Sequence, residues 1–191
     1  MKLRPAGLLL VLVASTSYAS SIGIFADPDY ASCNLNIAAP PGIGTLYIAA
    51  IDVAQMPGAC AAFTGAEFRI QGLPPGWVVF STPNPAAVAV IGDPFGDGVD
   101  MAFSESLTSY SVPLYTVTIW PAAAGAQATL RVVAHSTPPD PMFSCVVGYA
   151  GDCPGPTHTC IDGGTLFINS DTPCTVAVAR SSWAGIKELF R

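Results

Sequence analysis

Hydrophobic positions along this chain of 191 residues form short runs that glycine and proline interrupt. The sequence holds eighteen residues of each, and the runs between them are rich in β-branched and aromatic residues, a pattern typical of strands and turns. In "EFRIQ" and "TLRVVAH" polar and apolar residues alternate, which indicates strands with one wet and one dry face. The runs that predict strands are "SIGIFA", "CNLNIAA", "GTLYIAAID", "GAEFRIQG", "WVVFS", "AAVAVIG", "GVDMAFS", "PLYTVTIW", "ATLRVVAH", "GTLFIN" and "CTVAVAR". This spacing predicts an all-β fold, an antiparallel β-sandwich of jelly-roll or Ig-like type with about nine to ten strands.

The last eleven residues, 181–191, carry a helical pattern instead. Trp183, Ile186 and Phe190 fall on one face of such a helix. A helix this short is marginal alone in water, so the apolar face must dock on something. Two alternatives stay open: the sandwich of the same chain, or a partner or secretion component.

The first nineteen residues have the layout of a signal peptide. Lys2 and Arg4 precede an apolar run that ends at Ala14, and small residues at Ser17 and Ala19 fit a cleavage site. The apolar run is well below the roughly 20 residues that span a bilayer. We therefore expect a leader at 1–19, a sandwich domain at 20–180 and the terminal helix, in a protein that is secreted to the cell surface, the periplasm or the medium. The mature chain is expected to have no transmembrane segment.

An exported domain with an even number of cysteines is normally disulfide-bonded. Seven residues separate Cys145 from Cys153 and six separate Cys153 from Cys160, whereas structural zinc sites usually hold ligands in closer pairs. The sequence thus predicts three disulfides rather than zinc. The preferred pairing joins Cys33 to Cys60 and leaves the last four cysteines to tie a loop between the final strands. The six are Cys33, Cys60, Cys145, Cys153, Cys160 and Cys174.

Charge narrows the set of partners. The leader holds two of the seven basic residues, so the remainder carries five Lys and Arg against thirteen Asp and Glu, a net charge of −8. Clustered basic residues are absent from the sequence, which argues against nucleic-acid binding and against adhesion to anionic lipid.

Catalytic motifs are also absent from the sequence: it has no G-x-S-x-G, no H-E-x-x-H and no phosphate-binding glycine loop. The two histidines are His135, which we interpret as a strand-end residue, and His158. Glu67 and Glu105 could serve as the two carboxylates of a glycosidase, but Glu67 lies in an alternating strand, where a solvated face is the favoured interpretation. The sequence therefore predicts that the protein is not an enzyme.

The densest acidic cluster is "GDPFGDGVD", with Asp93, Asp97 and Asp100. Calcium is the one cofactor that this cluster suggests, because it favours several oxygen ligands on a loop. The spacing does not match an EF-hand, and Asp and Gly also favour turns. A plain turn is the interpretation we favour.

Aromatic residues could stack on sugar rings. The candidates for carbohydrate or partner contact are Trp77, Trp120 and Tyr47, with Tyr110 and Tyr115 as further tyrosines. Trp77 follows "LPPG", where it could be an exposed turn aromatic, although the core is the favoured place for it.

From "GTLYIAAIDV" through "TGAEFRIQGLPPGW" to "GVDMAFSE" and "VPLYTVTIW", the order of strands and turns resembles cohesin-like and related carbohydrate-binding sandwiches of bacterial extracellular proteins. The resemblance implies a nine-stranded jelly roll that binds by a sheet face without catalysis. Six cysteines and a terminal helix depart from the cohesin pattern, and no dockerin-type repeat is present, so the type of partner does not carry over.

Two functions from different classes follow. The first is a non-catalytic module that presents a sheet face or edge to another extracellular protein, in an adhesive or structural role; the second is a carbohydrate-binding module. Three aromatic side chains in a row on one exposed face would favour sugar, whereas an apolar face without them or an uncovered edge strand would favour a protein.

Overall fold

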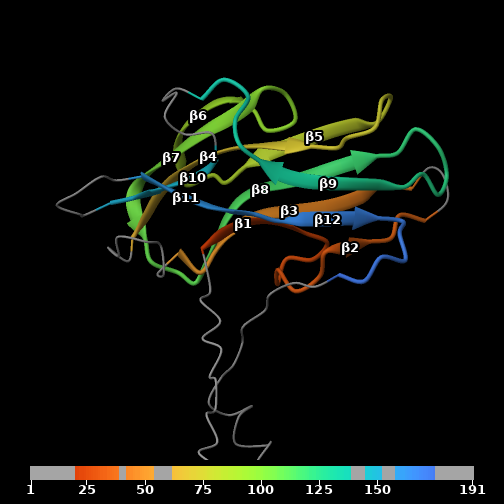
Figure 1. Cartoon of the computed structure of the whole chain (residues 1–191), viewed down its shortest axis with the longest axis horizontal. Coiled ribbons are helices and arrows are strands. Elements are labelled where there is room, and N and C mark those ends of the chain that lie inside the picture. Colours follow the sequence, from red (N-terminus) through yellow and green to blue (C-terminus); the bar gives the residue numbers. More distant parts are fainter. Residues whose placement is uncertain (1–19, 39–41, 54–61, 139–144, 152–157, 175–191) are drawn as a thin grey trace, which may run out of the picture.

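A computed structural model describes residues 20–38, 42–53, 62–138, 145–151 and 158–174 (Figure 1). The predicted leader, Cys60, Cys153 and the predicted helix with Trp183, Ile186 and Phe190 lie outside these ranges and stay predictions. Twelve strands occupy the described residues: β1 Ser21–Phe25, β2 Asn34–Leu35, β3 Gly44–Ile51, β4 Phe63–Gln71, β5 Val78–Pro83, β6 Ala87–Asp93, β7 Gly98–Leu107, β8 Ser111–Trp120, β9 Ala128–Val133, β10 Val146–Ala150, β11 His158–Gly163 and β12 Thr165–Ile168.

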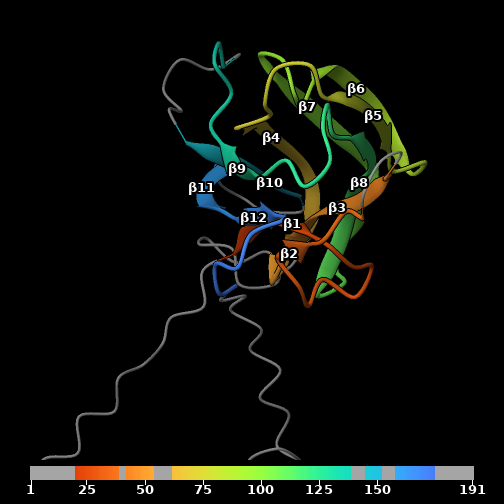
Figure 2. The same ribbon diagram turned by 90° about the vertical axis from the view of Figure 1, so that its right-hand side faces the viewer.

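The strands form two layers around one interior (Figure 2). The first layer has the order β5–β8–β3–β1, and the second has the order β6–β7–β4–β10–β11. Strands β9, β12 and β2 continue from the C-terminal half of β4. The predicted all-β sandwich is therefore confirmed.

Two pairings correct the expectation of a purely antiparallel sandwich. Strand β1 runs parallel to β11, with Ser21 beside Asp162, and β2 runs parallel to β12, with Asn34 beside Phe167. Each pair joins an early strand to a late one, so most of the domain serves as the crossover connection that a parallel pair needs. Alternation along a strand specifies its faces and not its direction, which is why the sequence did not reveal these pairs.

Strands β10 and β11 correct a second expectation, since that region was assigned to a disulfide-tied loop. The two strands pair with each other from Val146–Ile161 to Tyr149–His158, and β10 also pairs with β4. Their sequences, "VVGYA" and "HTCIDG", lack a clear alternation, so their strand structure depends on neighbours far away in the chain.

The core joins the two layers through large side chains. Phe68 of β4 meets Tyr115 of β8 edge to face, with ring centroids 6.3 Å apart. Fully burying a side chain of this class contributes about 1.5–3 kcal/mol. The largest fully buried residues are Phe63, Phe68, Ile22, Ile24, Leu46, Ile48, Leu114, Ile119, Leu130, Leu166 and Ile168.

Two disulfides are described, and one of them corrects the preferred pairing. Cys33 bonds to Cys174 rather than to Cys60, across 141 residues, with a Cα–Cα distance of 5.5 Å. Cys145 bonds to Cys160 with a Cα–Cα distance of 5.6 Å. The disulfide interpretation is thus confirmed for these four cysteines.

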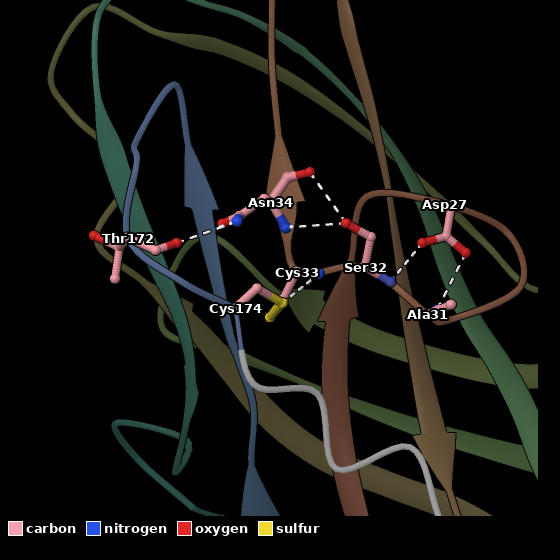
Figure 3. Close-up of a disulfide and its surroundings, with 7 residues drawn as sticks. All are labelled: Asp27, Ala31, Ser32, Cys33, Asn34, Thr172 and Cys174. Atoms are coloured by element: carbon pink, nitrogen blue, oxygen red, sulfur yellow. Dashed lines mark hydrogen bonds between the residues drawn. A yellow bond between two sulfur atoms is a disulfide. The ribbon is translucent and has the colours of Figure 1, made fainter. Parts of the chain in front are cut away.

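The Cys33–Cys174 pairing follows from the parallel contact between β2 and β12 (Figure 3). The segment after β12 runs back along β2, where the Asn34 side-chain amide donates to the Thr172 carbonyl at 3.1 Å. On the other side, the Asp27 carboxylate accepts backbone N–H bonds from Ser32 at 2.6 Å and Ala31 at 3.1 Å, which holds the loop before β2 in place. These hydrogen bonds hold the segments that contain Cys33 and Cys174 next to each other.

Candidate functional site

The outer face of the second layer brings together the most unusual polar groups of the described residues. The strand registers place side chains of four or five strands in two neighbouring rows across this face. The first row, which we call the acid row, is Ile91, Asp100, Glu67 and Val147. The second, the small row, is Ala89, Ala102, Gly65, Tyr149 and His158.

Glu67 is buried, and this corrects the solvated face that its alternating strand suggested. Its side chain is 1% exposed, and Tyr149 Oη donates a hydrogen bond to Glu67 Oε2 at 3.1 Å. Burial raises the pKa of the Glu67 carboxyl above its usual range, and the neighbouring charge of Asp100 raises it further. Folding therefore favours the neutral form of this group.

Asp100 lies directly opposite Glu67 and interacts with its carboxyl group. Burial also raises the pKa of Asp100. Glu67 Oε1 and Asp100 Oδ1 are both shielded from solvent, and neither accepts a hydrogen bond from a donor in the described part of the chain. A proton shared between the two carboxyls would satisfy both oxygens, because a protonated carboxyl becomes a donor.

A hollow of about 480 Å³ opens beside this pair. Gly65 and Ala102 contribute no large side chain to it, while Tyr149, Ile91 and Asp100 lie around it. A side chain at Gly65 would collide with the Met101 carbonyl, so the close approach of β4 and β7 at this position requires glycine. Its volume falls within the roughly 300–1,000 Å³ of small-ligand sites.

Both histidines lie near this face. The His135 ring packs against Gly98, whose φ of +138° and lack of a side chain permit the contact. His135 lies two residues beyond the end of β9, as expected for a strand-end residue, and its charge acts to lower the pKa of both carboxyls. His158 meets Tyr149 edge to face at 6.1 Å.

The three aspartates of the calcium hypothesis have separate local roles. Asp93 Oδ1 accepts a hydrogen bond from the Phe95 N–H at 2.9 Å, a turn contact. The Asp97 carbonyl accepts a hydrogen bond from the Ser136 hydroxyl at 2.8 Å. Asp100 belongs to the acid row. Across the described ranges, no group of three or more His, Cys, Asp or Glu side chains could hold a metal ion. The geometry therefore gives the calcium hypothesis no support.

The spacing of the carboxylates does not match a glycosidase. Glu67 and Asp100 lie within hydrogen-bonding reach of each other, closer than the roughly 5–9.5 Å that separates the two catalytic carboxyls of such enzymes. Glu105 is exposed on β7, five positions beyond Asp100 and in the stretch where the β4–β7 register is irregular, so it is not part of the buried pair.

The aromatic candidates are dispersed. Trp77 is 8% exposed and belongs to the core, and Tyr115 is buried as well, whereas Tyr110 is exposed. Trp120 and Tyr47 are half-buried on the first layer. Phe80 packs on Trp120 with an angle of 79° between the ring planes, so these two rings do not form a flat platform.

Strands β5 and β6 carry the largest exposed apolar surface of the described residues. They follow each other in the chain, yet β5 pairs only with β8 and β6 only with β7 within the described sheet. Five of the seven large hydrophobic side chains that are exposed in the described residues lie here, and we call this surface the β5–β6 edge. They are Val78, Phe80, Val88, Val90 and Ile91, between 38% and 68% exposed.

Several of these features were missed in the sequence. Tyr149 lay in a region interpreted as a loop, and "WVVFS" and "AAVAVIG" are nearly continuous apolar runs, which look the same whether a strand is buried or exposed. One available signal was the lack of charge, because residues 78–92 contain no Lys, Arg, Asp or Glu.

Known structures match this chain at low sequence identity and low TM-score. No protein-family model matches the chain, and no curated protein matches it. Among solved structures, it is similar to a cohesin module from a family 33 glycoside hydrolase of Clostridium perfringens, with 11% identity, a TM-score of 0.49, and coverage of 79% of this chain and 97% of that module. The C-terminal domain of the antigen I/II-family protein AspA of Streptococcus pyogenes is 8% identical, with a TM-score of 0.34; the match covers 80% of this chain and 47% of that one.

The first of these structures is of the kind that the sequence resembles. Both TM-scores lie below 0.5, so the account of function below depends on the geometry of this chain. In the described residues no helix has the length and apolar character needed to cross a membrane.

Proposed function

We propose that this chain is a secreted, non-catalytic β-sandwich module that binds another extracellular protein through the β5–β6 edge, in an adhesive or structural role. The observation that carries the proposal is the concentration of exposed apolar side chains on two strands that each pair on one side only, within the described sheet.

Unpaired strand edges attract other chains, and proteins usually protect them with charges, prolines or bulges. Residues 78–92 carry no charged side chain, and proline within the two strands occurs only at Pro83, the end of β5. Main-chain hydrogen bonds from an added strand would give affinity, and the exposed side chains would give specificity. Apart from an irregularity in the β6–β7 register between Ala87 and Ala89, the edge lacks these protections, which fits a binding role.

Export is supported by the two disulfides, since such bonds persist in oxidising compartments. The close approach of the Glu67 and Asp100 carboxyls described above argues against glycosidase activity.

Carbohydrate binding is the second candidate. The half-buried Trp120 and Tyr47, with the exposed Phe80, give the first layer aromatic side chains that a sugar could contact. The near-perpendicular rings of Phe80 and Trp120 favour the protein partner instead.

A capture experiment with three lysine variants tests the proposal. The wild-type domain and Phe80→Lys, Val88→Lys and Thr116→Lys would be immobilised, exposed to the secreted proteins of the source organism and, in parallel, to a glycan array. Thr116 is exposed on β8 beside Tyr47 and pairs with Thr82 of β5, so its variant adds the same charge to the first layer, one strand inward from the open edge.

We expect a defined protein that binds the wild type and Thr116→Lys and is lost from Phe80→Lys and Val88→Lys. Glycan binding that Thr116→Lys removes and Val88→Lys retains would contradict the proposal and support the carbohydrate module.

A further inference from the structure

We propose that the partner at the β5–β6 edge is a second copy of this chain, joined by antiparallel pairing of β6 with β6 of the second copy across a two-fold axis at Val90. This inference rests on the function proposed above, for which it names the partner.

Strand β6 is open on both of its faces. Six of its seven residues are exposed, and it pairs only with β7 within the described sheet. Val90 lies beside the buried Met101, on the inner face, whereas Ile91 lies beside Asp100, on the outer face. A partner that covers one face would leave the other open, so the occupant that fits is a strand that continues the sheet.

Charge favours a second copy at this place. The chain has a net charge of −6, so two copies repel each other wherever their acidic surfaces meet. Residues 78–92 carry no charged side chain. With the axis at Val90, Asp93 at the end of β6 lies opposite Ala87 of the second copy, so no like charges face each other across the new pair.

The sequence of β6 suits pairing with itself. Antiparallel strands that are related by a two-fold axis present the same residues to each other. On the outer face this pairing places the small Ala89 opposite the larger Ile91, and on the inner face it places Val90 opposite Val90. The axis lies beyond the register irregularity at Ala87–Ala89, in the regular part of the strand.

The exposed area suits a dimer as well. A full-size aromatic side chain offers roughly 150–250 Å² and Val or Ile somewhat less, so exposed fractions between 38% and 68% leave about 500 Å² open on the five large residues of the edge. Two copies would bury on the order of 1,000 Å², the size at which specific interfaces begin.

Strand β5 would add to the contact. The two layers are joined by β1 and β11 at one side, so β5 and β6 end the two layers at the remaining side (Figure 2). A two-fold axis through β6 therefore also brings the β5 strands of the two copies toward each other, with Val78 and Phe80 exposed on them.

Sedimentation of the purified protein tests the dimer. The wild type should sediment as a dimer whose fraction rises with concentration. Val90→Lys and Val90→Glu should each raise the dimer dissociation constant at least about tenfold, because each places like charges opposite each other at the axis. The control Ala31→Lys lies in the exposed loop before β2, which β7, β4, β9 and β12 separate from β6, and it should change the constant by less than about twofold.

Mixing the two charged variants gives a sharper test. Equal amounts of Val90→Lys and Val90→Glu should form a dimer again, because opposite charges then face each other across the axis. Recovery of the dimer would also show that both variants fold. A mixture that stays monomeric, or a wild type that sediments as a monomer, would overturn the second copy as the partner.

The capture experiment separates this inference from the proposed function. If the wild type is monomeric while Phe80→Lys and Val88→Lys still lose a captured secreted protein, the edge proposal stands and the second copy is wrong. If the wild type dimerises and both Val90 variants leave the dimer intact, the dimer forms through another surface, and this inference fails whatever the capture experiment gives.

Discussion

Glu67 shows how much a single residue can depend on neighbours that its own strand does not reveal. The alternation in "EFRIQ" placed Glu67 on the face opposite Phe68, and the structure agrees, since Phe68 is in the core. That second face is covered around Glu67 by Tyr149 and Asp100, which arrive from β10 and β7. The alternation therefore predicted on which face of the strand the Glu67 side chain lies, but it could not predict that other strands bury this side chain.

The carboxyl pair should make stability depend on pH. Both pKa values are raised in the folded state, chiefly by burial, so the pair's contribution is full below the unfolded pKa values of about 4 and is lost as pH rises through the folded values. Glu67→Gln removes one titrating group and offers an amide donor to Asp100. Relative to the wild type, it should be more stabilising at pH 8 than at pH 4.

Urea unfolding of the wild type, Glu67→Gln and the exposed control Glu105→Gln at pH 4, 6 and 8 would measure this difference. An effect of Glu67→Gln that is the same at every pH would show that the pair does not titrate in this way.

Tyr115 offers a second test at this scale. Its hydroxyl is buried without a hydrogen-bond partner in the described residues, and burial, with a smaller effect of Asp93, raises its pKa to about 12. Tyr115→Phe removes an unsatisfied group and keeps the ring on Phe68, so it should stabilise the domain by about 1 kcal/mol at pH 7. The wild type should also lose stability between pH 10 and 12, because Tyr115 ionises near pH 10 in the unfolded chain and stays neutral up to about pH 12 in the folded one. The variant should lose less.

Chemical denaturation at pH 7, 10 and 11 is the measurement for Tyr115. A clear loss of stability in Tyr115→Phe at pH 7 would mean that the hydroxyl has a partner after all.

At the scale of elements, the sequence predicted the strands whose composition is typical of strands. It did not predict the strands that form because of pairing with distant segments. The strands β3 and β9 fall within predicted runs, and β4 and β8 begin two residues before theirs, because β-branched residues and flanking turns are local signals. Strands β10 and β11 have glycine and polar residues and form through pairing with β4 and with each other. Cysteine pairing was mispredicted for the same reason, since Cys33 meets Cys174 only after β2 and β12 align.

The two disulfides should differ in their effect on stability. The chain-entropy model predicts a larger loss for the longer loop, and the bonds span 141 and 15 residues. Replacing Cys33 and Cys174 together by Ser should cost more than replacing Cys145 and Cys160 together, about 4–5 against about 3 kcal/mol. Thermal and urea unfolding of the two double variants would measure this, and a larger loss for the Cys145–Cys160 variant would contradict it.

For the whole molecule, the sequence supported an all-β sandwich, and twelve strands in two layers confirm it. The parallel contacts between the first and last strands and the exposure of β5 and β6 were not predictable, because both depend on which strands become neighbours. The same long-range arrangement creates the β5–β6 edge, which we propose binds a partner, and the hollow that Asp100 lines.

The central claim is that the β5–β6 edge binds a protein. Amide hydrogen exchange of the domain alone and in complex with its captured partner tests this most directly, because a strand added to an open edge protects amides that exchange readily when they are unpaired. The account predicts slower exchange across residues 78–93 in the complex, with β3 unchanged. Slower exchange confined to the amides of β3 and β8, with residues 78–93 exchanging as in the free domain, would contradict it.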